Sequence, residues 1–381
     1  MNKKDAERSG CGVSPVVRVL HVGPGWGQRG GIASVLAELA GERERFAAQE
    51  ILFSFFETHG FQSIKGVLSF LLLDIPRFFV AMCGDVNIVH FHVSVRGSFY
   101  RKYMLYLLAR LFGKKAAFHL HAGNFERFVV GSSRVIRDAA SRFARGADAA
   151  VAVSSAIGDE VSRYRGTRDG LYVIGNTARM AQAASHAIPR KANRNTPPYI
   201  AFVGRLAEGK GIDDLMKALA ILADRGVHVG LKLAGGGDLD RWKRAASAHR
   251  VDHSVEFVGW LEGEEKLSLY RNARVFCMPS HFESFGISTL EAMFLGVPVV
   301  GTSVGGFLDL VEDERTGYLV SPGDVERLVD RIHILLDNPD LAVRMGAEAA
   351  KRACSRYSVE KIADQYVCCY RNVMALPGGK R

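Results

Sequence analysis

A short apolar run that ends in a glycine-containing loop and leads into a helical pattern occurs twice in this chain. The first copy starts with VVRVLHV at residues 16–22, followed by GPGWGQRGG and IASVLAELA, and the second starts with YIAFVGRL at residues 199–206. Eight further apolar runs predict strands, four after the first start (EILFSFF, NIVHFHV, AAFHLHA, AAVAVS) and four after the second (VGLKLAG, VEFVGW, RVFCMPS, VPVVGT). They alternate with helix-length segments, which predicts an α/β fold with a parallel, doubly wound sheet in each half. Such sheets bind ligands at the carboxyl ends of their strands, so we expect the site where the two sets of strand ends face each other.

The length of the chain and one polar interval define the expected domains. A chain of 381 residues exceeds what one hydrophobic core usually serves. Residues 174–198 are polar and end in two prolines, which indicates an interdomain linker. We therefore expect a ragged N-terminus (1–14), a first Rossmann-like domain (15–185), a second (186–355), and a C-terminal helix (356–381) that crosses back to the first domain.

The strongest local signal lies at residues 279–300, PSHFESFGISTLEAMFLGVPVV, where an apolar strand leads through a loop into a helix near Gly286. Glu283 precedes this helix and Glu291 lies on it, so both carboxylates are expected at the same mouth of the site. A helix start also offers free backbone N–H groups to a phosphate, and the donors predicted here belong to Ser284, Phe285, Gly286 and Ile287. The alternative is that the two glutamates only favour a helix start and a solvated face.

A second signal is FVGRLAEGKG at residues 202–211, where a strand ends and releases Arg205 and Lys210 into a loop. Two cations at the carboxyl end of a strand suit an anionic diphosphate, which arginine can bind with two parallel hydrogen bonds. Read alone, this loop predicts surface salt bridges equally well.

Together, ESFGISTLE, GRLAEGKG, QRGGIASVL and GVPVVGTSVGG resemble the motifs of glycosyltransferase family 4 (group 1), whose members have the GT-B fold. The resemblance extends over residues 16–370 and is densest in the second half. It implies an acceptor-binding first domain, a second domain that binds the nucleotide-sugar, a retaining hexosyltransferase-type reaction (EC 2.4), and catalysis with no metal and no cofactor. A UDP-sugar is the commoner donor in that family.

The resemblance also assigns roles to residues. Arg205 and Lys210 match the pair that binds the donor diphosphate, Glu291 matches the glutamate that binds the ribose hydroxyls, and Glu283 matches the one beside the transferred sugar. Backbone groups at Phe285 and Gly286 are expected to meet phosphate or sugar oxygens. In the first domain, Gly30 and Gly31 match a loop whose missing side chains let the donor approach the backbone.

The family's active-site histidine is best matched by His121 in FHLHAGNF, and His119 is the rival because it has the same parity on that strand. We prefer His121 because Ala122 and Gly123 follow it. The pairs His90/His92 and His119/His121 also permit an alternative, a metal-dependent hydrolase that binds a transition metal with four imidazoles. Such an enzyme has no evident need for GRLAEGKG and the two spaced glutamates.

Two other sequence patterns are weaker evidence of function. The first glycine loop gives only part of a dinucleotide fingerprint, because Gln28 stands where the last glycine of G-x-G-x-x-G belongs, so a nicotinamide dehydrogenase is disfavoured. Asp238 and Asp240 form a D-x-D that could bind a metal, but their place between a glycine turn and a helix favours helix capping. A non-enzymatic binding role would need an incomplete site, and no piece is missing.

The net charge and the hydropathy of the chain indicate which kinds of partner it could bind. The formal net charge of +10 is compatible with an anionic membrane or phosphate-bearing ligands, and nucleic acid is disfavoured because no basic-aromatic motif is present. The apolar stretch 67–83 contains Asp74, Pro76 and Arg77, which favours a buried or half-buried helix pair, with a membrane-facing surface as the alternative.

Cellular location and pathway follow from weaker signals. The six cysteines lack C-x-x-C pairing and the N-terminus lacks an apolar signal segment, so we expect reduced thiols in a cytoplasmic protein, peripheral on the inner membrane. The expected acceptor is a glycan or lipid-linked glycan, in bacterial exopolysaccharide, capsule or lipopolysaccharide synthesis.

Overall fold

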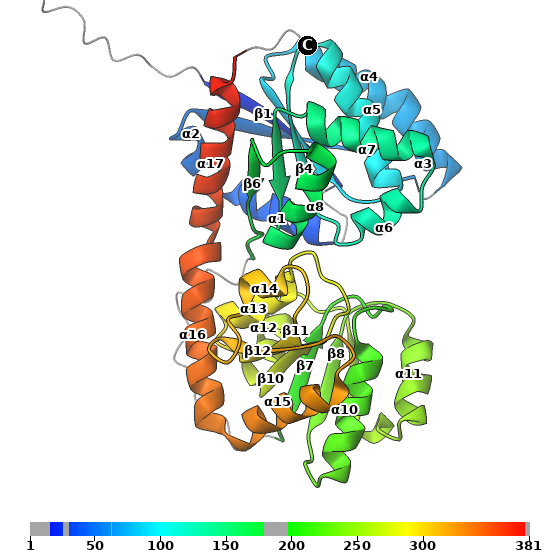
Figure 1. The fold of residues 1–381 in the computed structure, drawn as a ribbon, viewed down its shortest axis with the longest axis vertical. Helices are drawn as coiled ribbons and strands as arrows, with labels where there is room; N and C mark the ends of the chain where they lie inside the picture. The colour runs from blue at the N-terminus through cyan, green and yellow to red at the C-terminus, as the bar shows by residue number, and fades with distance from the viewer. Residues whose placement is uncertain (1–15, 26–29, 62, 179–196, 378–381) are drawn as a thin grey trace, which may run out of the picture.

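The computed structural model describes residues 16–25, 30–61, 63–178 and 197–377. Within these ranges the chain forms two parallel six-stranded sheets, each flanked by helices and stacked one above the other (Figure 1). The predicted α/β fold with two parallel sheets is therefore confirmed. The expected boundary at residues 185 and 186, most of the expected linker, and the N-terminal segment 1–14 lie outside the described residues.

The first sheet has the strand order β2-β1-β3-β4-β5-β6. Its strands are β1 (Val17–Gly23), β2 (Ile51–Glu57), β3 (Ile88–Val93), β4 (Lys115–Leu120), β5 (Ala149–Ala152) and β6 (Leu171–Val173). Its helices are α1 (Gly31–Gly41), α2 (Arg43–Ala47), α3 (Ile64–Ser69), η1 (Phe70–Asp74), α4 (Ile75–Cys83), α5 (Gly97–Leu111), α6 (Phe125–Val130), α7 (Arg134–Gly146) and α8 (Ser155–Arg165). All residues of β3 and β5 are buried, as expected for strands covered on both faces.

The second sheet has the order β12-β11-β10-β7-β8-β9. Its strands are β7 (Tyr199–Val203), β8 (Gly230–Ala234), β9 (Val255–Gly259), β10 (Val275–Met278), β11 (Val299–Thr302) and β12 (Gly317–Val320). Its helices are α10 (Ile212–Asp224), α11 (Leu239–Ala248), η2 (Asp252–Ser254), α12 (Gly263–Asn272), α13 (Ile287–Phe294), α14 (Phe307–Leu310), α15 (Val325–Asp337) and α16 (Pro339–Tyr357). The sequence predicted ten of the twelve strands in the two sheets, and it missed the two short edge strands β6 and β12.

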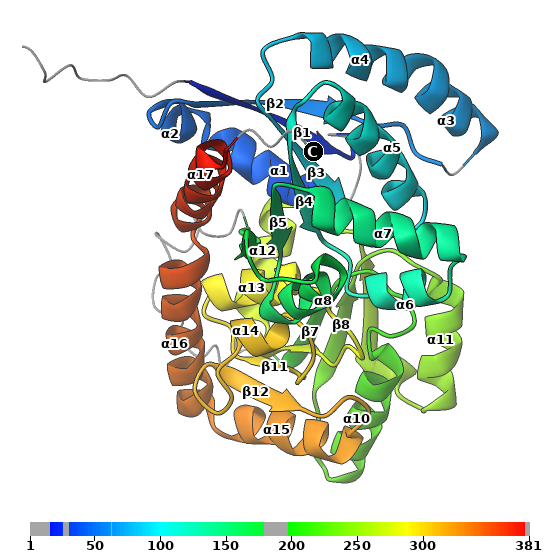
Figure 2. The same cartoon turned by 45° about the horizontal axis from the view of Figure 1, so that its top comes forward.

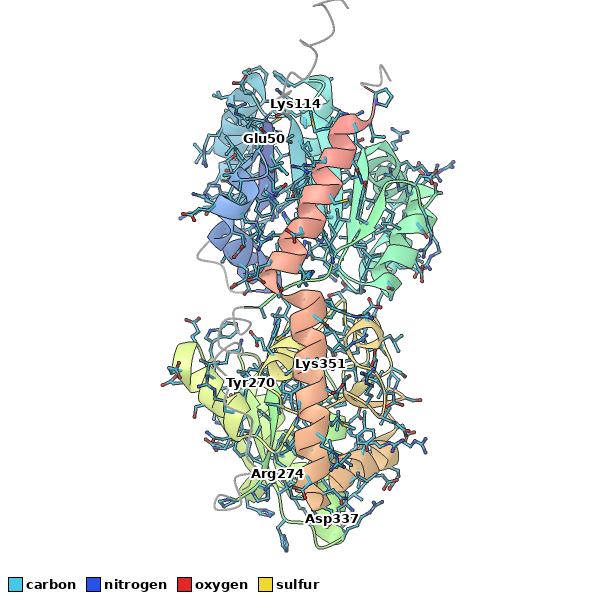
Figure 3. The ribbon with its side chains drawn as sticks, turned by 90° about the vertical axis from the view of Figure 1, so that its left-hand side faces the viewer. Glu50, Lys114, Tyr270, Arg274, Asp337 and Lys351 are labelled. Carbon is cyan, nitrogen blue, oxygen red and sulfur yellow. The ribbon has the colours of Figure 1, made fainter. Side chains whose placement is uncertain are left out.

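The last two helices connect the domains. Helix α16 lies along the second domain and α17 (Val359–Ala375) continues onto the first, as Figure 3 shows. Ser358 joins them and caps α17, because its hydroxyl accepts a hydrogen bond from the Lys361 N–H. On the first domain α17 is held by the pair of Arg45 with Asp364 at 3.0 Å. A second contact runs from the Lys115 ammonium to the Val373 carbonyl at 2.6 Å.

The expected helix pair at residues 67–83 is wrong. The structure has one continuous helix from Ile64 to Cys83, and 22% of its most apolar window is buried. Its middle, η1, is a π-helical turn in which the Ile75 N–H donates to the Phe70 carbonyl, which accommodates Pro76 without ending the helix. This helix is long and apolar enough to cross a membrane by length and composition alone. Figure 2 shows it as the outermost layer of the first domain.

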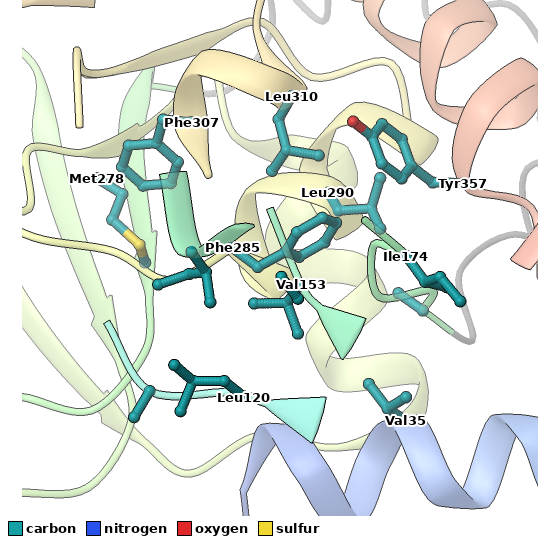
Figure 4. Close-up of a cluster of buried hydrophobic side chains, with 14 of the residues drawn as sticks. Val35, Leu120, Val153, Ile174, Met278, Phe285, Leu290, Phe307, Leu310 and Tyr357 are labelled. Carbon is teal, nitrogen blue, oxygen red and sulfur yellow. The ribbon is translucent and has the colours of Figure 1, made fainter. Parts of the chain in front are cut away.

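A shared apolar cluster lies where the two domains meet. Figure 4 shows Leu120, Val153 and Ile174 of the first domain close to Phe285 and Leu290 of the second. The Phe285 ring is 2% exposed. The junction therefore buries the segment that carries the strongest sequence signal.

Candidate functional site

The loop after β10 and the start of α13 supply the backbone donors that the sequence predicts. Gly286 precedes α13 with φ 101°, a conformation that favours glycine, and a Cβ there would lie 2.5 Å from the Phe307 ring. In the described part of the chain, no hydrogen bond engages the backbone N–H groups of Ser284, Phe285, Gly286 or Ile287. The helix start thus keeps its donors for an anion.

Each glutamate of the ESFGISTLE motif holds a lysine. The Lys210 ammonium lies 2.7 Å from Glu283 Oε2, and the Lys266 ammonium lies 2.6 Å from Glu291 Oε1. The Tyr270 hydroxyl also donates to Glu291 Oε2 at 2.8 Å. The interpretation of these glutamates as merely a solvated face does not fit, because both are largely buried and engaged.

Glu291 is 8% exposed, and its two partners come from α12. Burial first, and then the neighbouring carboxylate, raise the pKa of Tyr270 well above its usual value, so its hydroxyl remains a donor. Each carboxylate oxygen of Glu291 has a second lone pair that a hydroxyl could use. Sequence reasoning missed Lys266 and Tyr270, although their four-residue spacing places them on one face of a helix.

Arg205 lies in the loop after β7, with an exposed side chain. Among the described residues its guanidinium has no ion pair or hydrogen bond. The two predicted cations therefore differ in their partners: Lys210 pairs with Glu283, whereas the Arg205 guanidinium is available to a ligand.

Three glycines of the first domain lie against this loop or at the entrance to it. Gly30 has φ 154° at the start of α1, and a Cβ on Gly31 would lie 3.0 Å from Ile287 Cδ1. A Cβ on Gly123 would lie 3.0 Å from the Ser284 nitrogen. Because these glycines have no side chains, the first domain can approach the start of α13. The sequence did not predict the contact of Gly123 with this segment.

The two candidate histidines differ in their surroundings. His119 is fully buried on β4, whereas His121 is partly exposed just beyond the strand and two residues before Gly123. Burial lowers the pKa of His121 to about 3, so the ring is neutral near pH 7. Of the two, His121 is the one at the junction with the second domain.

The histidines noted as a candidate metal site form two groups within reach of one ion. The groups are His21, His90 and His92, and His92, His119 and His121, with candidate ligand atoms within 4.8 Å of one another. The rings are hydrogen-bonded to each other, for example His92 Nδ1 to His121 Nε2 at 2.9 Å. His21 is not among the histidines predicted from the sequence; it lies beside His90 in the neighbouring strand β1, so its side chain is on the same face of the sheet.

The D-x-D pattern is a helix cap, as expected. Asp238 precedes α11, and its carboxylate accepts a hydrogen bond from the Arg241 N–H at 3.0 Å.

Comparison with known proteins identifies the second domain. Residues 185–352 match the family model of glycosyl transferases group 1. A curated relative, a glycogen synthase of Mycobacterium tuberculosis, is 32% identical over 246 residues, which cover 64% of this chain and 58% of the relative. The chain thus spans just over half the length of that relative.

Solved structures with the same fold cover nearly the whole chain. HepE of Anabaena, in complex with UDP and glucose, aligns with a TM-score of 0.71 at 21% identity and covers 92% of this chain and 98% of its own. The sucrose-phosphate synthase of Thermosynechococcus elongatus aligns with a TM-score of 0.75 at 20% identity and covers 95% and 100%. None of these comparisons supports the hydrolase alternative. Residues 185–352 are therefore similar to group 1 glycosyl transferases, and the chain has the GT-B fold of these solved structures.

Proposed function

We propose that this protein is a retaining glycosyltransferase (EC 2.4) that moves a hexose from a UDP-sugar to a glycan or lipid-linked glycan acceptor, without a metal or cofactor. The observation that carries the proposal is the pair of lysine–glutamate contacts, Lys210 with Glu283 and Lys266 with Glu291, at opposite ends of one loop and helix start. They flank the free N–H groups that precede α13.

The donor diphosphate would bind between the start of α13 and the cations Arg205 and Lys210. Breaking the bond between the sugar and the diphosphate places negative charge on the leaving group, and preorganised N–H donors and cations stabilise such charge. Lys210 already lies 2.7 Å from Glu283, so its ammonium can bridge a phosphate oxygen and that carboxylate. These groups supply the positive charge that a metal ion would otherwise provide, which supports metal-free transfer.

Glu291 would accept hydrogen bonds from the two ribose hydroxyls. Lys266 and Tyr270 hold its carboxylate in one orientation, at 2.6 and 2.8 Å. The comparison with HepE, a protein solved with UDP and glucose, favours a UDP-sugar over other donors.

The reacting sugar would lie between His121 of the first domain and Glu283 of the second. Positive charge develops on the sugar ring in the transition state, and Glu283 is the nearest carboxylate expected to stabilise it. The departing phosphate accepts the proton of the acceptor hydroxyl, since no protein nucleophile is assigned. Neutral His121 can donate to or accept from a sugar hydroxyl, which would hold the ring in place.

The acceptor would be presented at a membrane surface, with the enzyme peripheral on its cytoplasmic face. The helix Ile64–Cys83 exposes Leu72 and Val80 by 69% and 70%, and Leu111 at the end of α5 is 82% exposed. Cationic side chains on or beside these helices, Lys65, Arg77 and Lys114, complement anionic headgroups. A lipid-linked acceptor and a role in bacterial polysaccharide synthesis are consistent with this surface.

The deciding experiment measures ligand binding before turnover. Thermal unfolding and calorimetry with UDP, GDP, ADP and their sugar conjugates, each with and without EDTA, would compare the wild type with Glu291→Gln. We expect UDP to raise the unfolding midpoint of the wild type in EDTA, because a ligand that binds only the folded state stabilises it. The increase should be lost in Glu291→Gln, which keeps the side-chain volume, and retained in the surface variant Glu348→Gln.

Two outcomes would contradict the proposal. Stabilisation by a nucleotide only when a divalent metal is present would overturn the metal-free mechanism. A response to zinc and to no nucleotide would overturn the transferase assignment itself.

A further inference from the structure

Five histidines, His121 among them, and one tyrosine form a buried hydrogen-bonded cluster inside the first domain. In the register of the sheet His21 pairs with His90, and His92 with His119, so their side chains share one face. Helix α17 covers that face and inserts Tyr370, which is fully buried. The cluster thus joins the start of the chain, the middle of the first domain and the C-terminal helix.

The six side chains form one unbranched series of hydrogen bonds, in which each side chain is linked to the next. The links are His121 Nε2 to His92 Nδ1 (2.9 Å), His92 Nε2 to His21 Nδ1 (2.9 Å), His21 Nε2 to Tyr370 Oη (3.2 Å), Tyr370 Oη to His90 Nδ1 (2.9 Å), and His90 Nε2 to His119 Nδ1 (3.0 Å). One end is His119 Nε2, which is buried and has no partner among the residues that the structure describes. The other end is His121 Nδ1, at the junction of the domains.

All five rings are neutral near pH 7. Burial lowers the pKa of His21 and His121 to about 3, and it lowers the pKa of the other three well below 6.5, with the neighbouring rings as a smaller cause. A neutral imidazole has one N–H and one lone pair. Each link between two rings therefore needs one hydrogen, and the tautomer of one ring fixes that of the next.

The direction of the Tyr370 hydrogen therefore determines the state of His121. If Tyr370 donates to His21, then His21 and His92 carry their hydrogens on Nδ1, and His121 presents an N–H at its free Nδ1. If Tyr370 instead accepts from His21, the same rule leaves a lone pair at His121 Nδ1. The hydroxyl has one hydrogen, so donating to His90 excludes donating to His21.

We propose that Tyr370 is a positioning residue, which through His21 and His92 fixes the tautomer of His121 and hence whether His121 donates to or accepts from the bound sugar. This inference rests on the proposed function, because it takes His121 as the histidine that contacts the donor sugar. It links the C-terminal helix to the reacting group by hydrogen bonds that span the buried interior of the first domain. Conversely, a ligand that binds only one tautomer of His121 fixes the direction in which the Tyr370 hydroxyl donates its hydrogen.

The test compares Tyr370→Phe with Tyr366→Phe in the full-length protein. Tyr366 lies one turn earlier on the same helix, is equally buried and packs on His90, but in the described part of the chain its hydroxyl has no hydrogen-bond partner, which makes it a matched control. Nitrogen-15 NMR of histidine-labelled protein distinguishes protonated from bare ring nitrogens, and the signals missing from His121→Gln assign His121.

In the wild type and in Tyr366→Phe we expect His121 to occupy one tautomer, with well-separated shifts for its two nitrogens. In Tyr370→Phe neither an N–H nor a lone pair at His21 Nε2 finds a partner. The free-energy difference between the two hydrogen-bond arrangements, with and without a hydrogen on His121 Nδ1, therefore becomes smaller. The two His121 shifts should then move toward each other. Unchanged shifts in Tyr370→Phe, or equal changes in the control, would overturn the coupling.

Turnover tests the positioning role. We expect Tyr370→Phe to lower kcat about fivefold to tenfold, the effect of weakening one hydrogen bond in the transition state, with the donor KM nearly unchanged. Tyr366→Phe should keep the wild-type kcat. Shifted tautomers with an unchanged kcat would overturn the positioning role, and a stoichiometric transition metal on the histidines of the purified protein would overturn the hydrogen-bonded chain.

The NMR result does not depend on turnover. If the wild type transfers no sugar, the proposed function fails, and the tautomer coupling is still decided by the shifts.

Discussion

Lys210 and Lys266 each satisfy one glutamate of the same motif, but the two glutamates differ in how many side chains hold them. The two lysine side chains are about equally exposed, at 24% and 22%. Lys210 comes from the loop after β7 and pairs with Glu283, whereas Glu291 is bound by both Lys266 and the Tyr270 hydroxyl of α12. The Lys210 ammonium can therefore turn toward a phosphate and keep Glu283 as a second partner. Lys266 is better placed to hold Glu291 still.

At the scale of single residues, we predict that Lys210→Ala lowers kcat for sugar transfer by about 10²- to 10³-fold. This corresponds to about 3–4 kcal/mol of transition-state stabilisation, the usual cost of losing one preorganised donor. Steady-state kinetics with the donor identified by the binding experiment would measure it. The control is Lys217→Ala, because Lys217 is an exposed lysine whose ammonium pairs with Asp213 on the same helix, α10. Normal turnover in Lys210→Ala would show that this lysine does not act on the diphosphate.

At the scale of elements, the continuous helix Ile64–Cys83 is the clearest departure from expectation. Its π-helical turn ends at Asp74, which is buried and accepts a hydrogen bond from the backbone N–H of His59 at 2.7 Å. The opposite side keeps its apolar residues in solvent. An exposed apolar face with cations beside it is typical of helices that lie on anionic membranes.

We predict that the protein sediments with vesicles of phosphatidylglycerol and not with vesicles of phosphatidylcholine, because the cations need anionic headgroups. The double variant Leu72→Asp/Val80→Asp should lose most of this binding, since both side chains are exposed on the helix. Leu308→Asp, at an exposed apolar site of the second domain, should bind like the wild type. Equal sedimentation of all three proteins would exclude this helix as the docking surface.

At the scale of the whole molecule, the proposed site draws residues from both domains. The second domain holds the lysine–glutamate pairs, and the first contributes His121 and the glycines that approach α13. A direct contact between the domains is the hydrogen bond from the Ser155 N–H to Asp309 at 2.6 Å. Helices α16 and α17 hold the two parts on one side, as Figures 1 and 3 show.

We predict that Gly123→Val separates nucleotide binding from transfer. A Cβ at this position lies 3.0 Å from the Ser284 nitrogen, so the larger side chain should push the domains apart. Calorimetry should then show UDP bound nearly as in the wild type, while kcat falls at least about tenfold, because a small displacement of the reacting groups is enough. Gly41→Val is the control, since a Cβ on Gly41 meets no atom within 4 Å. Unchanged turnover in Gly123→Val would show that this contact is dispensable.

Much of the fold was predictable from the sequence because its signals are local. Apolar runs, glycine loops and helix starts depend on neighbours in the chain, which is why ten of the twelve strands and the start of α13 were found. The edge strands β6 and β12 have only three and four residues and were missed, because so short a run has no clear period. The predicted site residues of the second domain likewise came from one short motif and one loop.

The sequence by itself determined the two parallel sheets, the loops at their strand ends and the residues that these loops carry, because alternation and turn chemistry act over a few residues. Only the tertiary structure decided which partners those residues meet. Glu283 meets a lysine 73 positions away, and His90 meets a tyrosine 280 positions away. It also decided that the apolar helix faces outward, since burial depends on how distant segments pack and no local pattern specifies that.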